Sequence, residues 1–276
     1  MPSKYFTPMP GRIIKTNGTE LYVVEKGSGP VLLLLHGLGW SHALWGDLLE
    51  KLSERYRLIA GDSRGHGLSA KPPGPYSMDQ MTADWVGVLN AAGINRFSVV
   101  GLSQGGMIAM RLAVTLPERV SALGLLATTS YFSEQEWAAM EERGKVALSG
   151  GPRAAAEHTA KAIFSKQFAT ENRGIISEFV DNRMAASMVG LRGAMAALRG
   201  FDVRSALPVV RCPALVMHGT ADLVISPESA QQTVKLLPHA DHVMVDGAGH
   251  ILPVERPESV LQQLSRFLDV YLRAER

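Results

Sequence analysis

Short runs of apolar residues alternate with stretches of helical spacing along most of this 276-residue chain. Residues 31–35 are apolar on both faces, as expected of an inner strand that helices cover on each side. The order of strand and then helix repeats, with further strands at 58–60, 97–100 and 123–127. Parallel strands need a crossover between them, usually a helix. The alternation therefore predicts an α/β fold with a doubly wound, mostly parallel sheet.

The chain ahead of this alternation has the pattern of a β-hairpin. Ile13 and Ile14 lead into Asn17-Gly18, and residues 21–24 form a second apolar run. Asn-Gly favours the two-residue turn of positive φ that joins antiparallel strands. We therefore expect an antiparallel hairpin before the parallel strands begin.

The alternation is interrupted between residues 131 and 200. This stretch is rich in Ala, Met, Glu and Arg and has no β-rich run, so it predicts several helices. Strand and helix patterns then return at 214–217, 227–237, 242–245 and 257–272. We expect residues 1–130 and 201–276 to form the core and residues 131–200 to form an inserted helical cap.

Charge and cysteine content narrow the classes of partner. The chain has 28 basic and 26 acidic residues without blocks of one sign, which predicts no nucleic-acid partner. Cys212 is the only cysteine, which excludes an internal disulfide framework and a cysteine-rich metal site. No apolar run has the length of a signal peptide or membrane span. We expect a cytoplasmic protein that binds no metal. Whether the chain forms a homo-oligomer stays open.

A Gly-x-Ser-x-Gly pattern lies where a predicted strand meets a predicted helix. Gly101, Ser103 and Gly105 occupy its fixed positions. A serine on such a sharp turn is presented at the end of the sheet, and the helix that follows directs its amino-terminal dipole towards charge developing nearby. The alternative is an ordinary glycine-rich turn, but the position between strand and helix favours a nucleophile.

A serine hydroxyl needs a base, usually histidine, and a carboxylate that orients this base. Asp222 follows the strand at 214–217, and His250 follows the strand at 242–245. Taken singly, Asp222 is as well explained as a turn or capping residue and His250 as a loop histidine. Together they complete the order Ser, Asp, His expected after such a turn.

The loop after the first parallel strand is the candidate oxyanion hole. His36-Gly37-Leu38-Gly39 would place the Leu38 backbone NH beside the attacked carbonyl oxygen, with the Gln104 NH as the second donor. A plain glycine turn is the alternative.

These residues together resemble the α/β-hydrolase superfamily through nearly the whole chain. The resemblance is carried by segments 36–39 and 62–69, the turn around Ser103, Asp222 and His250. Segments 64–76 and 101–120 look most like 3-oxoadipate enol-lactonases and related carboxylesterases. Serine at position 103 argues against the similar haloalkane dehalogenases and epoxide hydrolases, which use an aspartate nucleophile.

Substrate contacts are harder to assign from sequence. The aromatic and methionine residues that could touch substrate are Trp40 after the oxyanion loop and, in the cap, Trp137, Met140, Phe164 and Met188. Packing within the protein is the alternative for each. The cap has nine basic and eight acidic residues, which gives little electrostatic case for a strongly anionic substrate.

We therefore predict a cofactor-free serine hydrolase that cleaves ester or lactone bonds of small molecules through an acyl-enzyme. A C–C bond hydrolase or a perhydrolase could use the same three side chains. From a different class, a receptor on this fold could bind a small ligand under the cap with little turnover. The identity of the substrate stays open.

Overall fold

One eight-stranded sheet organises the computed structural model, which describes residues 4–272. Its strands are β1 Arg12–Thr16, β2 Thr19–Lys26, β3 Val31–Leu35, β4 Arg57–Gly61, β5 Phe97–Leu102, β6 Val120–Leu126, β7 Ala214–Gly219 and β8 Ala240–Val245. Their spatial order is β1-β2-β4-β3-β5-β6-β7-β8. β2 pairs antiparallel with β1 and with β4, and the remaining pairs are parallel. The predicted α/β class and mostly parallel sheet are confirmed.

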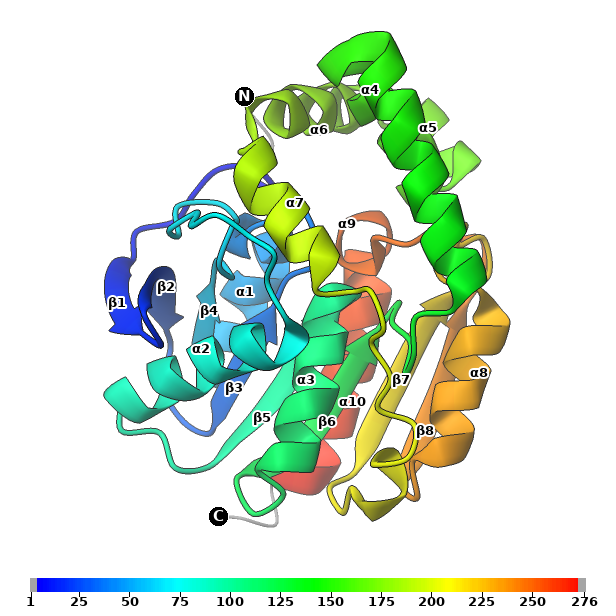
Figure 1. Cartoon of the computed structure of the whole chain (residues 1–276). Coiled ribbons are helices and arrows are strands. Elements are labelled where there is room, and N and C mark those ends of the chain that lie inside the picture. Colours follow the sequence, from blue (N-terminus) through cyan, green and yellow to red (C-terminus); the bar gives the residue numbers. More distant parts are fainter. Residues whose placement is uncertain (1–3, 273–276) are drawn as a thin grey trace.

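Helices cover both faces of this sheet (Figure 1). One face packs against α2 Met78–Ala91, α3 Gln104–Thr115 and α8 Pro227–Leu236. The opposite face packs against α1 Gly46–Ser53 and α10 Pro257–Leu272, with the short helices η1 His42–Trp45 and α9 Leu252–Glu255 beside them. The two buried apolar clusters lie on opposite faces because successive side chains of a strand alternate between them.

Helices between β6 and β7 stand above the carboxyl ends of the parallel strands (Figure 1). They are α4 Glu134–Ile163, α5 Lys166–Glu171, α6 Arg173–Ala185 and α7 Met188–Ala196, and we call them the cap helices. Serine hydroxyls accept backbone NH groups at the starts of α4, α5 and α7. Such caps satisfy amides that a helix leaves unpaired. Gly151 interrupts α4 with φ 79°, and Pro152 begins its second half.

The chain from the cap back to the core contains the short helix η2 Leu207–Val209. Within residues 4–272, no helix is long and apolar enough to cross a membrane. The outermost residues of the two predicted core segments, 1–3 and 273–276, lie outside the described part of the chain.

Candidate active site

The carboxyl end of β5 holds Ser103 in a strained conformation. Its φ is 54° and its ψ is −118°, in a region that non-glycine residues rarely occupy. The Ser103 amide donates to the Leu126 carbonyl at 2.9 Å, and the Thr128 hydroxyl donates to the Ser103 carbonyl at 2.8 Å. Bonds to neighbouring β6 and the segment after it therefore hold the turn. The side chain is left half-buried at the edge of the sheet below the cap.

Close backbone contacts explain the two glycines of the pattern. A Cβ at Gly101 would overlap the Gly105 carbonyl oxygen, and a Cβ at Gly105 would overlap the Leu35 carbonyl oxygen. The turn can be this tight only because both positions lack a side chain. The pattern thus has a packing reason as well as the predicted chemical one.

Asp222 and His250 meet at the same edge of the sheet. His250 Nδ1 and Asp222 Oδ2 are 2.8 Å apart, and both side chains are buried. The other carboxylate oxygen of Asp222 accepts the amides of Val224 at 2.8 Å and Ile225 at 3.1 Å. Burial alone would raise the pKa of Asp222, but His250 and these amides hold it below its usual value. An ionised Asp222 keeps the imidazole proton on Nδ1 and leaves Nε2 free to accept a proton.

A second histidine touches the carboxylate of Asp222. His218, at the end of β7, is fully buried, and its Nε2 lies 2.9 Å from the Ile225 carbonyl and 3.3 Å from Asp222 Oδ2. Burial lowers the pKa of His218, which favours the neutral ring. We did not predict His218 as part of the site. The signal available in the sequence was its position four residues before Asp222.

Among residues 4–272, no hydrogen bond joins the Ser103 hydroxyl to His250. Such bonds are often long in enzymes without substrate and shorten in the reacting complex. The structure thus brings the predicted acid and base into contact, and it places the predicted nucleophile at the same sheet edge.

The predicted oxyanion loop runs directly beside Ser103. A Cβ at Gly37 would lie 3.3 Å from Ser103 Cβ, so glycine lets the loop approach the serine without a tight contact. Gln104 is the first residue of α3, where helix amides have no partner within the helix. In the described part of the chain, neither the Leu38 nor the Gln104 amide has an acceptor. Both donors are therefore available to a developing oxyanion.

Asp62 links this loop to the segment after β4. One oxygen accepts both the backbone amide of His42, at 2.7 Å, and its Nδ1, at 2.8 Å, while the other accepts the Leu68 amide at 2.7 Å. Burial raises the pKa of Asp62, but His42 and His36 outweigh this and hold it below its usual value. His36 Nε2 accepts the Ser63 amide at 2.9 Å. This part of the family motif supports the loop and does not reach the reacting atoms.

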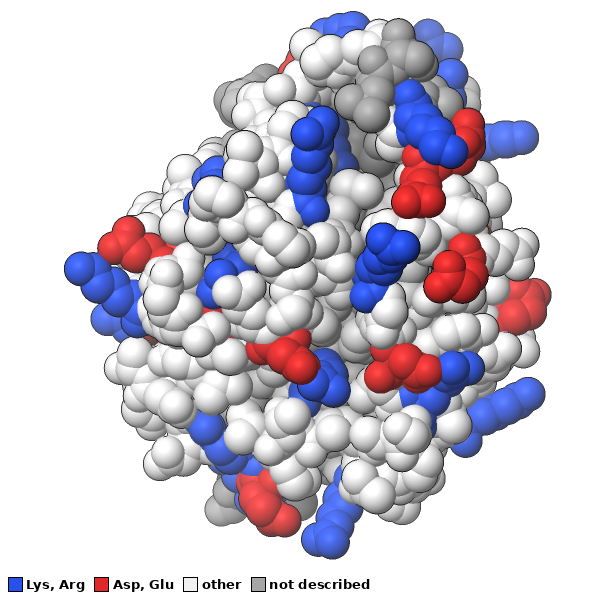
Figure 2. All heavy atoms as spheres, in the orientation of Figure 1, with Lys and Arg blue, Asp and Glu red and all other residues white. Residues whose placement is uncertain are grey.

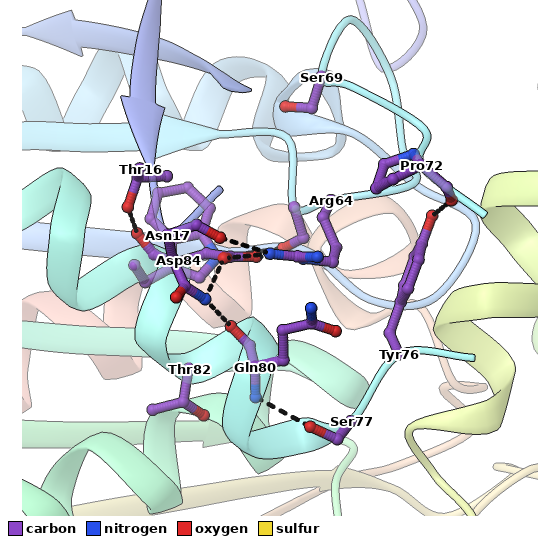
Figure 3. Close-up of polar contacts among 12 residues, drawn as sticks. Thr16, Asn17, Arg64, Ser69, Pro72, Tyr76, Ser77, Gln80, Thr82 and Asp84 are labelled. Atoms are coloured by element: carbon purple, nitrogen blue, oxygen red, sulfur yellow. Dashed lines mark hydrogen bonds and ion pairs between the residues drawn. The ribbon is translucent and has the colours of Figure 1, made fainter. Parts of the chain in front are cut away.

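A buried ion pair anchors the same segment to α2 (Figure 3). The Arg64 guanidinium makes two 2.6 Å hydrogen bonds to the carboxylate of Asp84, and Asn17 donates to Asp84 at 2.9 Å. Arg64 also lies 5.5 Å from the centre of the Tyr76 ring. His66 is also buried, and its Nδ1 lies 3.0 Å from the Arg64 carbonyl, so both side chains organise this segment.

The five predicted substrate contacts lie in three places. Trp40 and Phe164 are buried against each other, with ring centres 6.4 Å apart, beside Phe179 of α6. Trp137 and Met140 are half-buried in α4 and pack against the other apolar cluster. Met188 is 52% exposed at the start of α7. Only Trp40 lines the cavity beside the oxyanion loop.

That cavity, of about 240 Å³, lies between the core and the cap helices. Its walls come from the segment before β1, the loops after β3 and β4, and α6. In the part of the chain that the structure describes, no group of three or more His, Cys, Asp or Glu side chains is placed to hold a metal ion.

Known proteins resemble this chain through most of its length. A family model described as alpha/beta hydrolase fold matches residues 30–257. 3-Oxoadipate enol-lactonase 2 of Acinetobacter baylyi is 28% identical over 230 residues, covering 83% of this chain and 85% of that protein. The crystal structure of the enol-lactonase from Burkholderia xenovorans is similar, with a TM-score of 0.87 and 27% identity, covering 94% of this chain and all of that one. A thermophilic esterase from Thermogutta terrifontis has a TM-score of 0.86 and 28% identity, covering 95% and 99%.

Proposed function

Because this chain belongs to the alpha/beta hydrolase fold family, we propose that it is a serine hydrolase that cleaves carboxylic ester or lactone bonds of small molecules. One observation carries the proposal. A strained serine after β5 and a buried His–Asp pair after β7 and β8 lie at one edge of the sheet, beside two backbone NH groups without acceptors. Relatives named as enol-lactonase and esterase support this bond type.

The first half-reaction forms an acyl-enzyme. Ser103 Oγ attacks the carbonyl carbon while His250 Nε2 takes the hydroxyl proton, and the Leu38 and Gln104 amides stabilise the oxyanion. His250 then gives the proton to the alkoxide oxygen as the C–O bond breaks. Asp222 stays ionised throughout and stabilises the imidazolium.

The second half-reaction consumes water. His250 takes a proton from a water molecule that attacks the acyl carbon, and the collapse of the intermediate returns the proton to Ser103 Oγ. The products are a carboxylic acid and an alcohol, which remain one molecule when the substrate is a lactone.

Hydrolysis of p-nitrophenyl acetate and butyrate tests the proposal. We expect turnover by the wild type and a loss of about 10³-fold or more in kcat for Ser103→Ala, since removing the nucleophile leaves only binding and oxyanion stabilisation. Ser205→Ala, on an exposed loop residue, is the matched control and should keep the wild-type rate. Equal rates for wild type and Ser103→Ala would contradict a nucleophilic role, and ester binding without turnover would favour the receptor.

A further inference from the structure

An arginine from the cap reaches the cavity beside the oxyanion loop. Arg183 lies in the last turn of α6, and its guanidinium covers Gly39 so closely that a Cβ there would overlap it. Trp40 and Phe179 form an apolar part of the same cavity wall. The half-buried cation therefore lies between the core and the cap helices.

Arg183 has no acidic partner. Among residues 4–272, no hydrogen bond or ion pair is made by its guanidinium, and Asp181, the nearest acid in the sequence, pairs with Arg153 at 3.0 Å. Burial lowers the pKa of Arg183 to about 10, so the group still carries its charge at neutral pH. A partly desolvated charge without a counter-ion is unfavourable, and an anion in the cavity would offset this effect.

The dipole at the end of α6 does not by itself explain why Arg183 lies in the cavity. A cation in the last turn of a helix is favourable, but the same benefit is available to a side chain that stays in water. Arginine also presents a planar fork of donors that matches two oxygens of one carboxylate. Arg183 lines the cavity, and in the described part of the chain no acceptor occupies its donors.

The other ionisable groups in the cavity do not neutralise Arg183. Both oxygens of Asp62 already accept hydrogen bonds from His42 and Leu68. Burial lowers the pKa of His66 to about 3, so this ring is neutral. Lys71 adds a second positive charge, although its ammonium already donates to the Gly67 and Ser69 carbonyls. Local charge in the cavity is therefore positive, whereas Lys and Arg are interspersed with Asp and Glu on the face seen in Figure 2.

The guanidinium lies near the bond to be cleaved. Gly37 packs against Ser103, and Gly39, which Arg183 covers, is two residues further along the chain. Two residues span at most about 7 Å. An anion on Arg183 would thus lie against the same loop that runs past Ser103.

We propose that Arg183 binds a free carboxylate of the substrate, so that the site selects small esters or lactones that carry a carboxylate a few bonds from the cleaved carbonyl. This inference rests on the proposed hydrolase function. A single unpaired guanidinium matches the single charge of a carboxylate, whereas a phosphate dianion would need further donors. The near-equal numbers of basic and acidic residues in the cap gave no indication of this preference. Most of those charges are paired or exposed and do not act in the cavity.

Two methyl esters of the same diacid test the proposal, and comparing their ratio between variants cancels the second ester group of the diester. Monomethyl glutarate has a free carboxylate, and dimethyl glutarate has the same chain without it. For Arg183→Gln, we expect the ratio of kcat/KM for the monomethyl to the dimethyl ester to fall about 10- to 100-fold, the range for a lost hydrogen-bonded charge contact. Arg183→Lys should retain part of the preference, since it keeps the charge but loses the fork. Arg173→Gln, which alters an exposed arginine at the start of the same helix, is the matched control and should leave the ratio unchanged.

Binding without catalysis separates this inference from the proposed function. In Ser103→Ala, glutarate should raise the melting temperature at fixed ionic strength, and Ser103→Ala combined with Arg183→Gln should lose this shift. If the wild type hydrolyses neither ester, the hydrolase proposal fails while the binding measurement still decides the anion site. An unchanged ratio in Arg183→Gln, or an equal shift by glutarate in both backgrounds, would overturn the anion site alone. A larger shift by inorganic phosphate than by glutarate would overturn the choice of carboxylate.

Discussion

The hydrogen bonds of the two Asp222 carboxylate oxygens orient His250, the proposed base. One oxygen faces His250 Nδ1 and the neighbouring His218, while the other accepts two backbone amides. Every one of these partners can act as a donor, so the carboxylate is bound as an acceptor only. This polarity keeps the proton of a neutral His250 on Nδ1 and leaves Nε2 as the acceptor.

The substitution Asp222→Asn tests how much a group that only accepts hydrogen bonds at this position contributes to catalysis. An amide can turn its NH₂ towards His250 and select the wrong tautomer, so we expect kcat for p-nitrophenyl butyrate to fall by about 10³- to 10⁴-fold with little change in fold. Asp241→Asn, which alters an exposed carboxylate in β8, should retain full activity. A loss of less than tenfold in Asp222→Asn would argue against Asp222 as the residue that orients the base.

At the scale of elements, Asp62 joins η1 to the segment after β4, and the next residue, Ser63, donates to His36 of the oxyanion loop. Its folded pKa lies below the usual value near 4, so it contributes stability at higher pH. This contribution is complete above the unfolded pKa and is lost as pH falls through the folded pKa. Acid should therefore weaken the support of the oxyanion loop.

Asp62→Asn should lower the free energy of unfolding by about 1–3 kcal/mol at pH 7, because the NH₂ group would face the Leu68 amide. The difference from wild type should shrink as pH falls below about 4, because the unfolded wild-type chain begins to bind a proton at Asp62 there. Urea unfolding at pH 7 and pH 3.5 measures both effects. Asp47→Asn, which removes an exposed ion pair with Lys4, should change stability little at either pH; a difference for Asp62→Asn that grows on acidification would contradict the argument.

Across the whole molecule, the cap helices are bonded to the loop that carries the base. The His250 amide donates to the carbonyl of Ile163 at the end of α4, at 2.8 Å. Buried Glu255 accepts the amides of Gly249 and Ser165, each at 3.1 Å. The cap therefore does more than cover the site, because its chain fixes the backbone on which His250 is placed.

Glu255→Gln should loosen this connection. Glutamine has one acceptor oxygen where the carboxylate has two, so one of the two amides loses its partner at a cost of about 1–3 kcal/mol. We expect faster amide hydrogen exchange in residues 163–168 and 247–251, together with a lower kcat. Glu258→Gln, on an exposed residue of α10, is the control. Unchanged exchange in both segments would show that Glu255 does not couple cap and core.

Local patterns in the sequence predicted most of the fold, but they predicted the ends of helices and strands less well. The hairpin around Asn17-Gly18 and the last helix, α10, have their predicted positions. Helix α2 begins at Met78, where the Ser77 side chain caps it. Strand β5 extends two residues further than predicted, to Leu102, which pairs with β6. The short helix α9 was missed because four residues are too few for a helical period.

The sequence by itself determined the fold class and the candidates Ser103, Asp222 and His250, because apolar period and the turn between strand and helix are local properties of the chain. Only the tertiary structure decided which charges and amides have partners. His218 beside Asp222, Glu255 between cap and core, and the unpaired Arg183 were not found from the pattern. These three findings depend on burial or on distances between segments that lie far apart in the chain. Counting acidic and basic residues in the sequence reveals neither burial nor distance.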